Sequence, residues 1–96
     1  MNLKTESNTS QVICFLSGRL DTIISQEVEP VIDKSCEEGK KLIFDFTQVD
    51  YISSTLLRIC LKKYKELGAG NFWIKAPKPD IKKVFKIAGL EKLIQD

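Results

Sequence analysis

The sequence predicts a single α/β domain built around a mostly parallel central sheet. Its 96 residues and 10.9 kDa suit one domain. Apolar residues make up 43% and charged residues 29% of the chain, as in globular domains. Strand-like and helix-like segments alternate, which favours parallel strands joined by right-handed crossovers. We expect the order β-β-α-β-α-β-α-α over residues 1–96, with an antiparallel edge strand and helices packed against the sheet.

The first two strands are expected to form an antiparallel pair. Residues 1–5 are a short edge strand, and a polar turn follows at residues 8–10. The second strand is the apolar run at residues 12–16, which we expect to be buried on both faces because the run is continuous. A loop follows at residues 18–22.

The first helix is predicted at about residues 24–38, with Gly39 after its end. Pro30 lies inside this pattern and would cost about 3 kcal/mol in a helix interior. The helix therefore either starts late, near residues 27–30, or bends at the proline. The helical spacing comes from Ile24, Val28, Val31, Ile32 and Cys36.

The second half of the chain repeats the alternation of strand and helix. Residues 41–47 form the best candidate for a central parallel strand, and residues 48–53 connect it to an amphipathic helix at 54–67. Ser53, Ser54 and Thr55 are each able to cap that helix. The remaining predicted elements are a strand at 71–75, a helix opened by residues 77–80 and ended by Gly89, and a last helical turn at 90–94.

Composition excludes several classes of catalytic and metal site. The chain has no histidine, which removes Ser-His and Cys-His nucleophile pairs and His-ligated zinc. Its three cysteines lack CxxC spacing, and Cys14 and Cys60 fall inside apolar patterns typical of core residues. Without a P-loop or a nucleophile–base pair, we expect a protein that is not an enzyme and takes no cofactor and no metal.

Charge and hydropathy predict a cytoplasmic protein that neither inserts into a membrane nor binds nucleic acid. No window approaches the roughly 20 apolar residues that span a bilayer. Residues 1–57 carry 5 basic and 9 acidic side chains, and residues 58–96 carry 10 basic and 4 acidic ones. The excess lysines are expected on solvated polar faces of helices, namely Lys62, Lys63, Lys65, Lys82, Lys83 and Lys86.

Two loops at the carboxyl ends of predicted strands are candidates for the functional site. Residues 17–22 follow one strand, and residues 50–55 lead directly into a helix. The first amides of a helix favour an anionic group, so a serine there can be a simple cap or can carry a phosphate. The residues alone leave both readings open.

Five short motifs, in order and spread over nearly the whole chain, resemble the STAS domain family. The resemblance is strongest to its stand-alone bacterial form, the anti-sigma factor antagonist. The motifs are GRLDT at 18–22, FDF at 44–46, VDYISS at 49–54, KYKELGAG at 63–70 and FKIAGL at 85–90.

The resemblance implies a phosphorylation switch in protein binding. Such antagonists bind an anti-sigma factor, often a serine-protein kinase of the GHKL type, and so release a sigma factor. The kinase phosphorylates a serine, here Ser54, and a PP2C-like phosphatase restores binding. Many relatives have Asp at Ser53 and Gly at Leu56. The partner-binding residues carried over are Asp21, Thr22, Ser53, Ser54, Thr55, Leu56 and Arg58.

The resemblance also leaves a second function open. Some STAS domains are accessory subunits of lipid-transport ABC complexes at a membrane, where they bind an ATPase without being phosphorylated. The residue at Leu56 gives this alternative some weight because it departs from the usual glycine. On either reading we expect a monomer or weak dimer.

Overall fold

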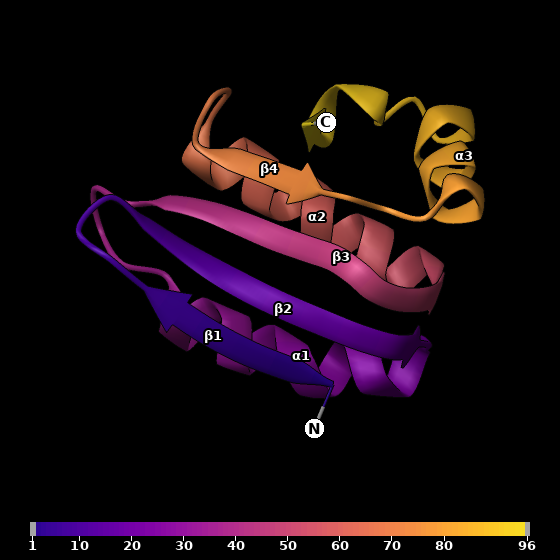
Figure 1. The fold of residues 1–96 in the computed structure, drawn as a ribbon, viewed down its shortest axis with the longest axis horizontal. Helices are drawn as coiled ribbons and strands as arrows, with labels where there is room; N and C mark the ends of the chain where they lie inside the picture. Colours follow the sequence, from indigo (N-terminus) through magenta and orange to yellow (C-terminus); the bar gives the residue numbers. More distant parts are fainter. Residues whose placement is uncertain (1, 96) are drawn as a thin grey trace.

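Five strands form one mixed sheet in the order β1-β2-β3-β4-β5 in the computed structural model (Figure 1). The structure describes residues 2–95, so Met1, which the predicted first strand includes, and Asp96 lie outside the described residues. The elements are β1 (Leu3–Ser7), β2 (Gln11–Leu20), α1 (Thr22–Ser35), β3 (Lys41–Ile52), α2 (Ser54–Leu67), β4 (Phe72–Lys75), α3 (Pro79–Ile87), the 3₁₀ turn η1 (Glu91–Leu93) and β5 (Ile94–Gln95).

The helices cover one face of the sheet. β1 pairs antiparallel with β2, and every later pair is parallel, as predicted. Each crossover moves one strand further in the same direction, so right-handed connections place α1, α2 and α3 on the same side. Figure 1 shows α1 and α2 behind the sheet. Among residues 2–95, no helix covers the opposite face.

This one-sided arrangement corrects one prediction about the second strand. In β2 the side chains of Val12, Cys14 and Leu16 are buried, whereas Ile13 and Phe15 are only half-buried. The alternation follows from a sheet with one covered face. The prediction that residues 12–16 are buried on both faces is therefore wrong.

The two central strands are longer than predicted. β2 continues to Leu20 and β3 to Ile52, so most of the predicted loop at 18–22 and of the connection at 48–53 is strand. Pairing survives because its register shifts after Phe15 and again after Gly18, whose φ of 77° suits glycine. These two bulges let β2 continue past Gly18 to Leu20, and β3 to Ile52, although the glycine predicted that the strand ends.

Helix α1 resolves the alternatives left open by Pro30. It begins at Thr22, well before the proline, so the late start is wrong. Pro30 lies on its exposed side, while Val28 and Ile32 are buried against the sheet. The helix ends at Ser35 with Cys36 as its C-cap, a turn earlier than the glycine-based prediction.

The C-terminal segment also differs from the prediction. α3 ends as expected, with Gly89 at a φ of 75° after the C-cap. The last helical turn predicted at 90–94 is a single 3₁₀ turn, η1, and the chain then forms the short strand β5. Ile94 pairs with Ile74 of β4, which gives that strand a partner on its outer edge.

The core lies between the covered face of the sheet and the helices. Phe44 of β3 packs edge-on against Phe72 of β4, with ring centroids 4.9 Å apart. The rings of Phe46 and of Phe85 in α3 have their centroids 5.9 Å apart, so α3 contributes to the same core. Within residues 2–95, no helix has the length and apolar character needed to cross a membrane.

The three cysteines are expected to differ in reactivity towards Ellman's reagent. Cys14 and Cys60 are fully buried, as predicted, and burial raises both pKa values, that of Cys14 to about 12. Cys36 is half-buried, with a pKa raised by burial to a smaller degree. Since the thiolate is the nucleophile, native protein at about pH 8 should titrate Cys36 first, and the other two only on unfolding. Rapid reaction of all three thiols would contradict this packing.

Candidate functional site

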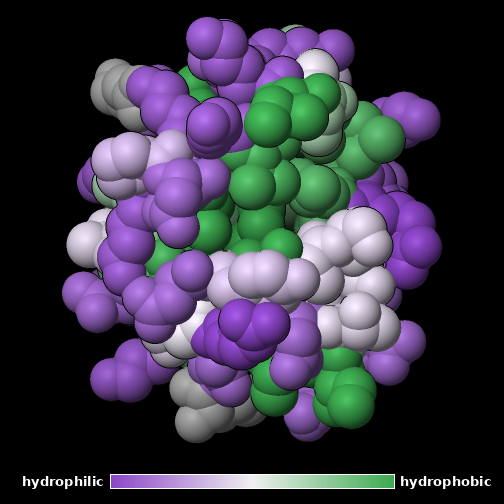
Figure 2. Space-filling model, turned by 90° about the vertical axis from the view of Figure 1, so that its right-hand side faces the viewer, coloured by the Kyte–Doolittle hydropathy of each residue, from purple (hydrophilic) through white to green (hydrophobic). Residues whose placement is uncertain are grey.

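Both loops singled out from the sequence meet at one end of the sheet. β2 and β3 are parallel neighbours whose last residues, Leu20 and Ile52, lie in register. The backbone N–H of Ser53 donates to the Leu20 carbonyl at 2.9 Å, which ties the two strand ends together. Helices α1 and α2 therefore start side by side at this end, which Figure 2 shows face on.

The two helices start with the same type of cap. The Asp21 carboxylate accepts a hydrogen bond from the Ile24 N–H at 2.9 Å, and the Ser53 hydroxyl accepts one from the Leu56 N–H at 3.3 Å. Of the three candidate caps of α2, Ser53 is thus the one in use. Because Ser53 takes this role, Ser54 becomes the first residue of the helix.

A buried pair of hydroxyls joins the two caps. Ser25 of α1 and Ser53 share a hydrogen bond of 3.2 Å, and Ser25 also donates to the Leu20 carbonyl at 3.3 Å. The sequence analysis missed Ser25, although a serine next to Ile24 and Val28 on the apolar side of the helix was a usable signal. The junction fixes how the starts of α1 and α2 sit relative to each other.

Three of the predicted partner-binding side chains are exposed at this end. Ser54 and Thr22 occupy the same position, the first residue of α2 and of α1 respectively. Arg58 lies one turn after Ser54 and is also exposed. The cap Asp21 is partly exposed.

The other three predicted partner-binding side chains face inward. Ser53 is 6% exposed, Thr55 is 7% exposed and Leu56 is fully buried. Leu56 belongs to the core cluster, so its isobutyl group, at the position where the family resemblance implies glycine, takes no space on the surface around Ser54. Its departure from the family pattern therefore leaves the surface around Ser54 unobstructed.

The end face carries further side chains that the sequence analysis did not place. The Arg19 guanidinium lies 4.0 Å from the centre of the Tyr51 ring, a cation–π contact between the ends of β2 and β3. Ile23 at the start of α1 is 69% exposed. Figure 2 shows hydrophobic side chains gathered in the upper half of this face, the half in which α3 lies. The strand ends that lead into α1 and α2 therefore carry a cationic and an aromatic side chain in addition to the exposed Ser54.

One lysine that the sequence placed on a solvated face is buried. Lys63 of α2 is 5% exposed and pairs with Asp33 of α1 and with Glu66, the latter at 3.1 Å. Burial alone would lower the pKa of Lys63, but the hydrogen bonds that its ammonium group donates to the Asp33 and Glu66 carboxylates outweigh burial, so the pKa is raised. The prediction for Lys63 is wrong because the facing carboxylate of α1 allows the ammonium group to lie between the helices.

The described residues contain no arrangement that indicates a metal site. No three Cys, Asp or Glu side chains in residues 2–95 gather closely enough to hold a metal ion. Asp45 accepts a hydrogen bond from the Thr47 N–H at 2.9 Å, and Asp50 pairs with Lys78. The end of the sheet at which α1 and α2 start presents a surface whose geometry is fixed by the hydrogen bonds described above.

Comparisons with known proteins agree with this description. The sequence model of the STAS domain family matches residues 2–95. A protein of Bordetella bronchiseptica, named as the anti-sigma factor antagonist BtrV, is 27% identical over 92 residues, which cover 93% of this chain and 79% of that protein.

Solved structures of the anti-sigma factor antagonist SpoIIAA share the fold. The unphosphorylated form superposes with a TM-score of 0.83 at 24% identity, covering 98% of this chain and 86% of the other. The phosphorylated form, from Bacillus, gives a TM-score of 0.75 at 24% identity and covers 98% and 89%. The fold is therefore the mixed sheet with one antiparallel pair that the sequence predicts.

Proposed function

We propose that this chain, which belongs to the STAS domain family, is an anti-sigma factor antagonist that releases a sigma factor by binding a serine-kinase anti-sigma factor. The relative named BtrV carries the same role in its name. The exposed Ser54 and the cation–π pair of Arg19 with Tyr51 at the same end of the sheet support a binding function. Phosphorylation of Ser54 would switch this binding off, and a phosphatase would restore it.

The observation that carries the proposal is the position of Ser54. Its side chain is exposed, while the neighbouring Ser53 and Thr55 are buried and Ser53 already caps the helix. Ser54 is thus accessible to a kinase and is not needed to hold α2 in place. A relative of the same fold is described in both an unphosphorylated and a phosphorylated form.

A phosphate on Ser54 would change the surface and leave the fold intact. It adds about −1.5 to −2 charges at neutral pH. The N-terminus of α2 favours a nearby anion by typically 0.3–1 kcal/mol, so the domain stays folded. An acidic partner surface would be repelled, and an apolar one would have to desolvate the phosphate, which also opposes binding. A hundredfold loss of affinity needs only about 2.7 kcal/mol.

The direct test is a pull-down from the native host with mass spectrometry of both the bound protein and the peptide that contains Ser54. We expect an anti-sigma factor with a GHKL-type kinase domain among the bound proteins, and a phosphorylated fraction of the peptide. Recovery of an ABC-type ATPase or permease with Ser54 unmodified would contradict the proposal and indicate a transport accessory subunit.

The variant Ser54→Asp is expected to weaken binding to the recovered anti-sigma factor by about 100-fold. The added charge would face the partner, while the helix start tolerates it. Isothermal titration calorimetry measures the affinity, and the melting temperature should stay within a few degrees of the wild type.

The matched control is Thr9→Asp, which adds the same charge in the turn between β1 and β2. Thr9 is exposed and lies at the opposite end of β2 from Ser54. It should bind like the wild type. Equal affinities of Ser54→Asp and Thr9→Asp would contradict a switch at Ser54.

A further inference from the structure

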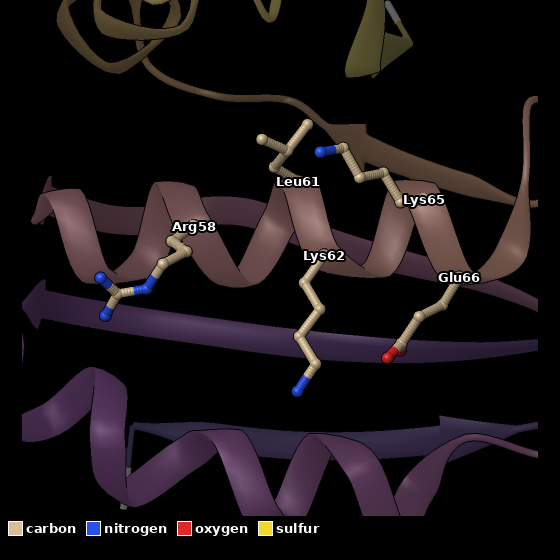
Figure 3. A pocket seen from close by; sticks show the side chains of 5 residues that line it. All are labelled: Arg58, Leu61, Lys62, Lys65 and Glu66. Atoms are coloured by element: carbon tan, nitrogen blue, oxygen red, sulfur yellow. The ribbon is translucent and has the colours of Figure 1, made fainter.

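The outer face of α2 carries an open groove that starts at Arg58, one helical turn after Ser54. Its volume is about 450 Å³, and we call it the α2 basic groove. Figure 3 shows that two groups of side chains diverge along the helix, one pointing towards α1 and the other towards the C-terminal segment. The groove is lined by Arg58, Leu61, Lys62, Lys65 and Glu66.

The cations of the groove are poorly compensated within the chain. Among the described residues, Arg58 and Lys65 form no ion pair. Lys62 reaches Glu29 of α1 only at 3.6 Å, with both side chains partly exposed, which is a weak pair. The single acid, Glu66, is bound to the buried Lys63 at 3.1 Å. The groove therefore presents a net positive charge to solvent.

We propose that the α2 basic groove docks an acidic segment of the anti-sigma factor, and that Arg58 is the cation shared between that segment and the phosphate on Ser54. This inference rests on the proposed function. Carboxylates of the partner complement Arg58, Lys62 and Lys65. The half-buried Leu61 between them offers an apolar contact for a partner side chain.

The position of Arg58 explains how a phosphate would act on the groove. Ser54 and Arg58 are four residues apart in α2, so they are neighbours on the helix surface. Both side chains are exposed. A phosphate on Ser54 would form a charge-assisted, bidentate contact with the guanidinium. The groove would then lose a cation and gain an anion at its end, and an acidic segment would be repelled.

Charge reversal tests the docking step with the purified anti-sigma factor recovered by the pull-down. The triple variant Arg58→Glu, Lys62→Glu, Lys65→Glu should bind at least about 100-fold more weakly than the wild type. The control reverses three exposed lysines elsewhere, Lys4→Glu, Lys41→Glu and Lys75→Glu, and should change affinity by less than about threefold. Circular dichroism confirms that each variant is folded, and Arg58→Gln with Lys65→Gln replaces a triple variant that is not.

The dependence of binding on salt and the binding of nucleic acid are two further tests of the α2 basic groove. Raising the salt from about 50 to about 500 mM should weaken the wild type at least tenfold and the charge-reversed variant much less. An equal loss of affinity for the anti-sigma factor in the groove variant and in its control would overturn the proposal. So would tight binding of a single-stranded oligonucleotide that the same reversals abolish, because the groove would then serve nucleic acid.

The shared role of Arg58 can be tested without any partner. Phosphoserine is installed at position 54, and the ³¹P chemical shift is followed against pH. The second phosphate pKa, about 6 when unperturbed, should be lowered in this protein and should rise in Arg58→Gln. The control Lys65→Gln should leave it unchanged. Identical phosphate pKa values with and without Arg58 would overturn the shared-cation step.

The two proposals fail in distinguishable ways. If Ser54→Asp weakens binding but the groove variant binds like the wild type, the groove proposal is wrong and the switch at Ser54 stands. If the groove variant loses binding but Ser54→Asp does not, the docking surface stands without the switch. If neither change alters binding, both are wrong.

Discussion

Replacing Leu56 by glycine, the residue that the family resemblance implies at this position, is expected to lower the free energy of unfolding by about 3–6 kcal/mol. The Leu56 side chain is fully buried in the core cluster, so its removal leaves a cavity. Removing a buried leucine side chain costs about 2–5 kcal/mol, and glycine in a helix adds about 1 kcal/mol. Urea unfolding measures the change.

Two companion variants separate the causes of that loss. Leu56→Ala retains the cavity without the glycine and should account for most of the effect. Arg58→Gly introduces glycine in the same helix at an exposed position and should cost about 1 kcal/mol or less. A loss in Leu56→Gly no larger than in Arg58→Gly would contradict the inward placement of Leu56.

Phe44→Ala is expected to cost about 3–5 kcal/mol of stability, the second large effect. Phe44 is fully buried on β3 and packs against both Phe46 and Phe72, with ring centroids 6.3 and 4.9 Å away. The edge-on contact with Phe72 adds about 0.5–1.5 kcal/mol beyond burial. Because total stabilities are typically 5–15 kcal/mol, Phe44→Leu serves as a milder variant if Phe44→Ala does not fold.

The matched control for this prediction is Phe15→Ala. Phe15 belongs to the neighbouring strand β2 but points to the face without helices, where it is only half-buried. Its loss should destabilise the protein by less than half as much, because less apolar area leaves contact with the protein. Equal losses from Phe44→Ala and Phe15→Ala would contradict the one-sided core.

The elements that the sequence predicted correctly are those whose pattern is local. The amphipathic helix 54–67 matches α2 (Ser54–Leu67) because its apolar spacing and its caps agree. The strand at 71–75 and the helix closed by Gly89 likewise follow from short apolar runs and turn residues. The parallel pairing of the later strands also follows from the alternation of strands and helices.

The misses come from contacts between segments far apart in the sequence. β2 extends past Gly18 because β3 pairs with it through shifted register, which no local pattern shows. Ile94 joins β5 because β4 has a free edge. Lys63 is buried because Asp33 of another helix faces it. Ser53 could be identified from the sequence as a possible cap of α2, but its hydrogen bond with Ser25 depends on how α1 and α2 lie next to each other.

The hydrogen bond between Ser25 and Ser53 has a consequence for how quickly and how tightly a partner can associate. Because that bond and the shared Leu20 carbonyl hold the starts of α1 and α2 together, Thr22 and Ser54 keep a fixed spacing in the free protein. A partner would meet a surface that needs no ordering on contact, so little conformational entropy is lost. Encounter is then a rigid-body event, with its rate set by diffusion and charge.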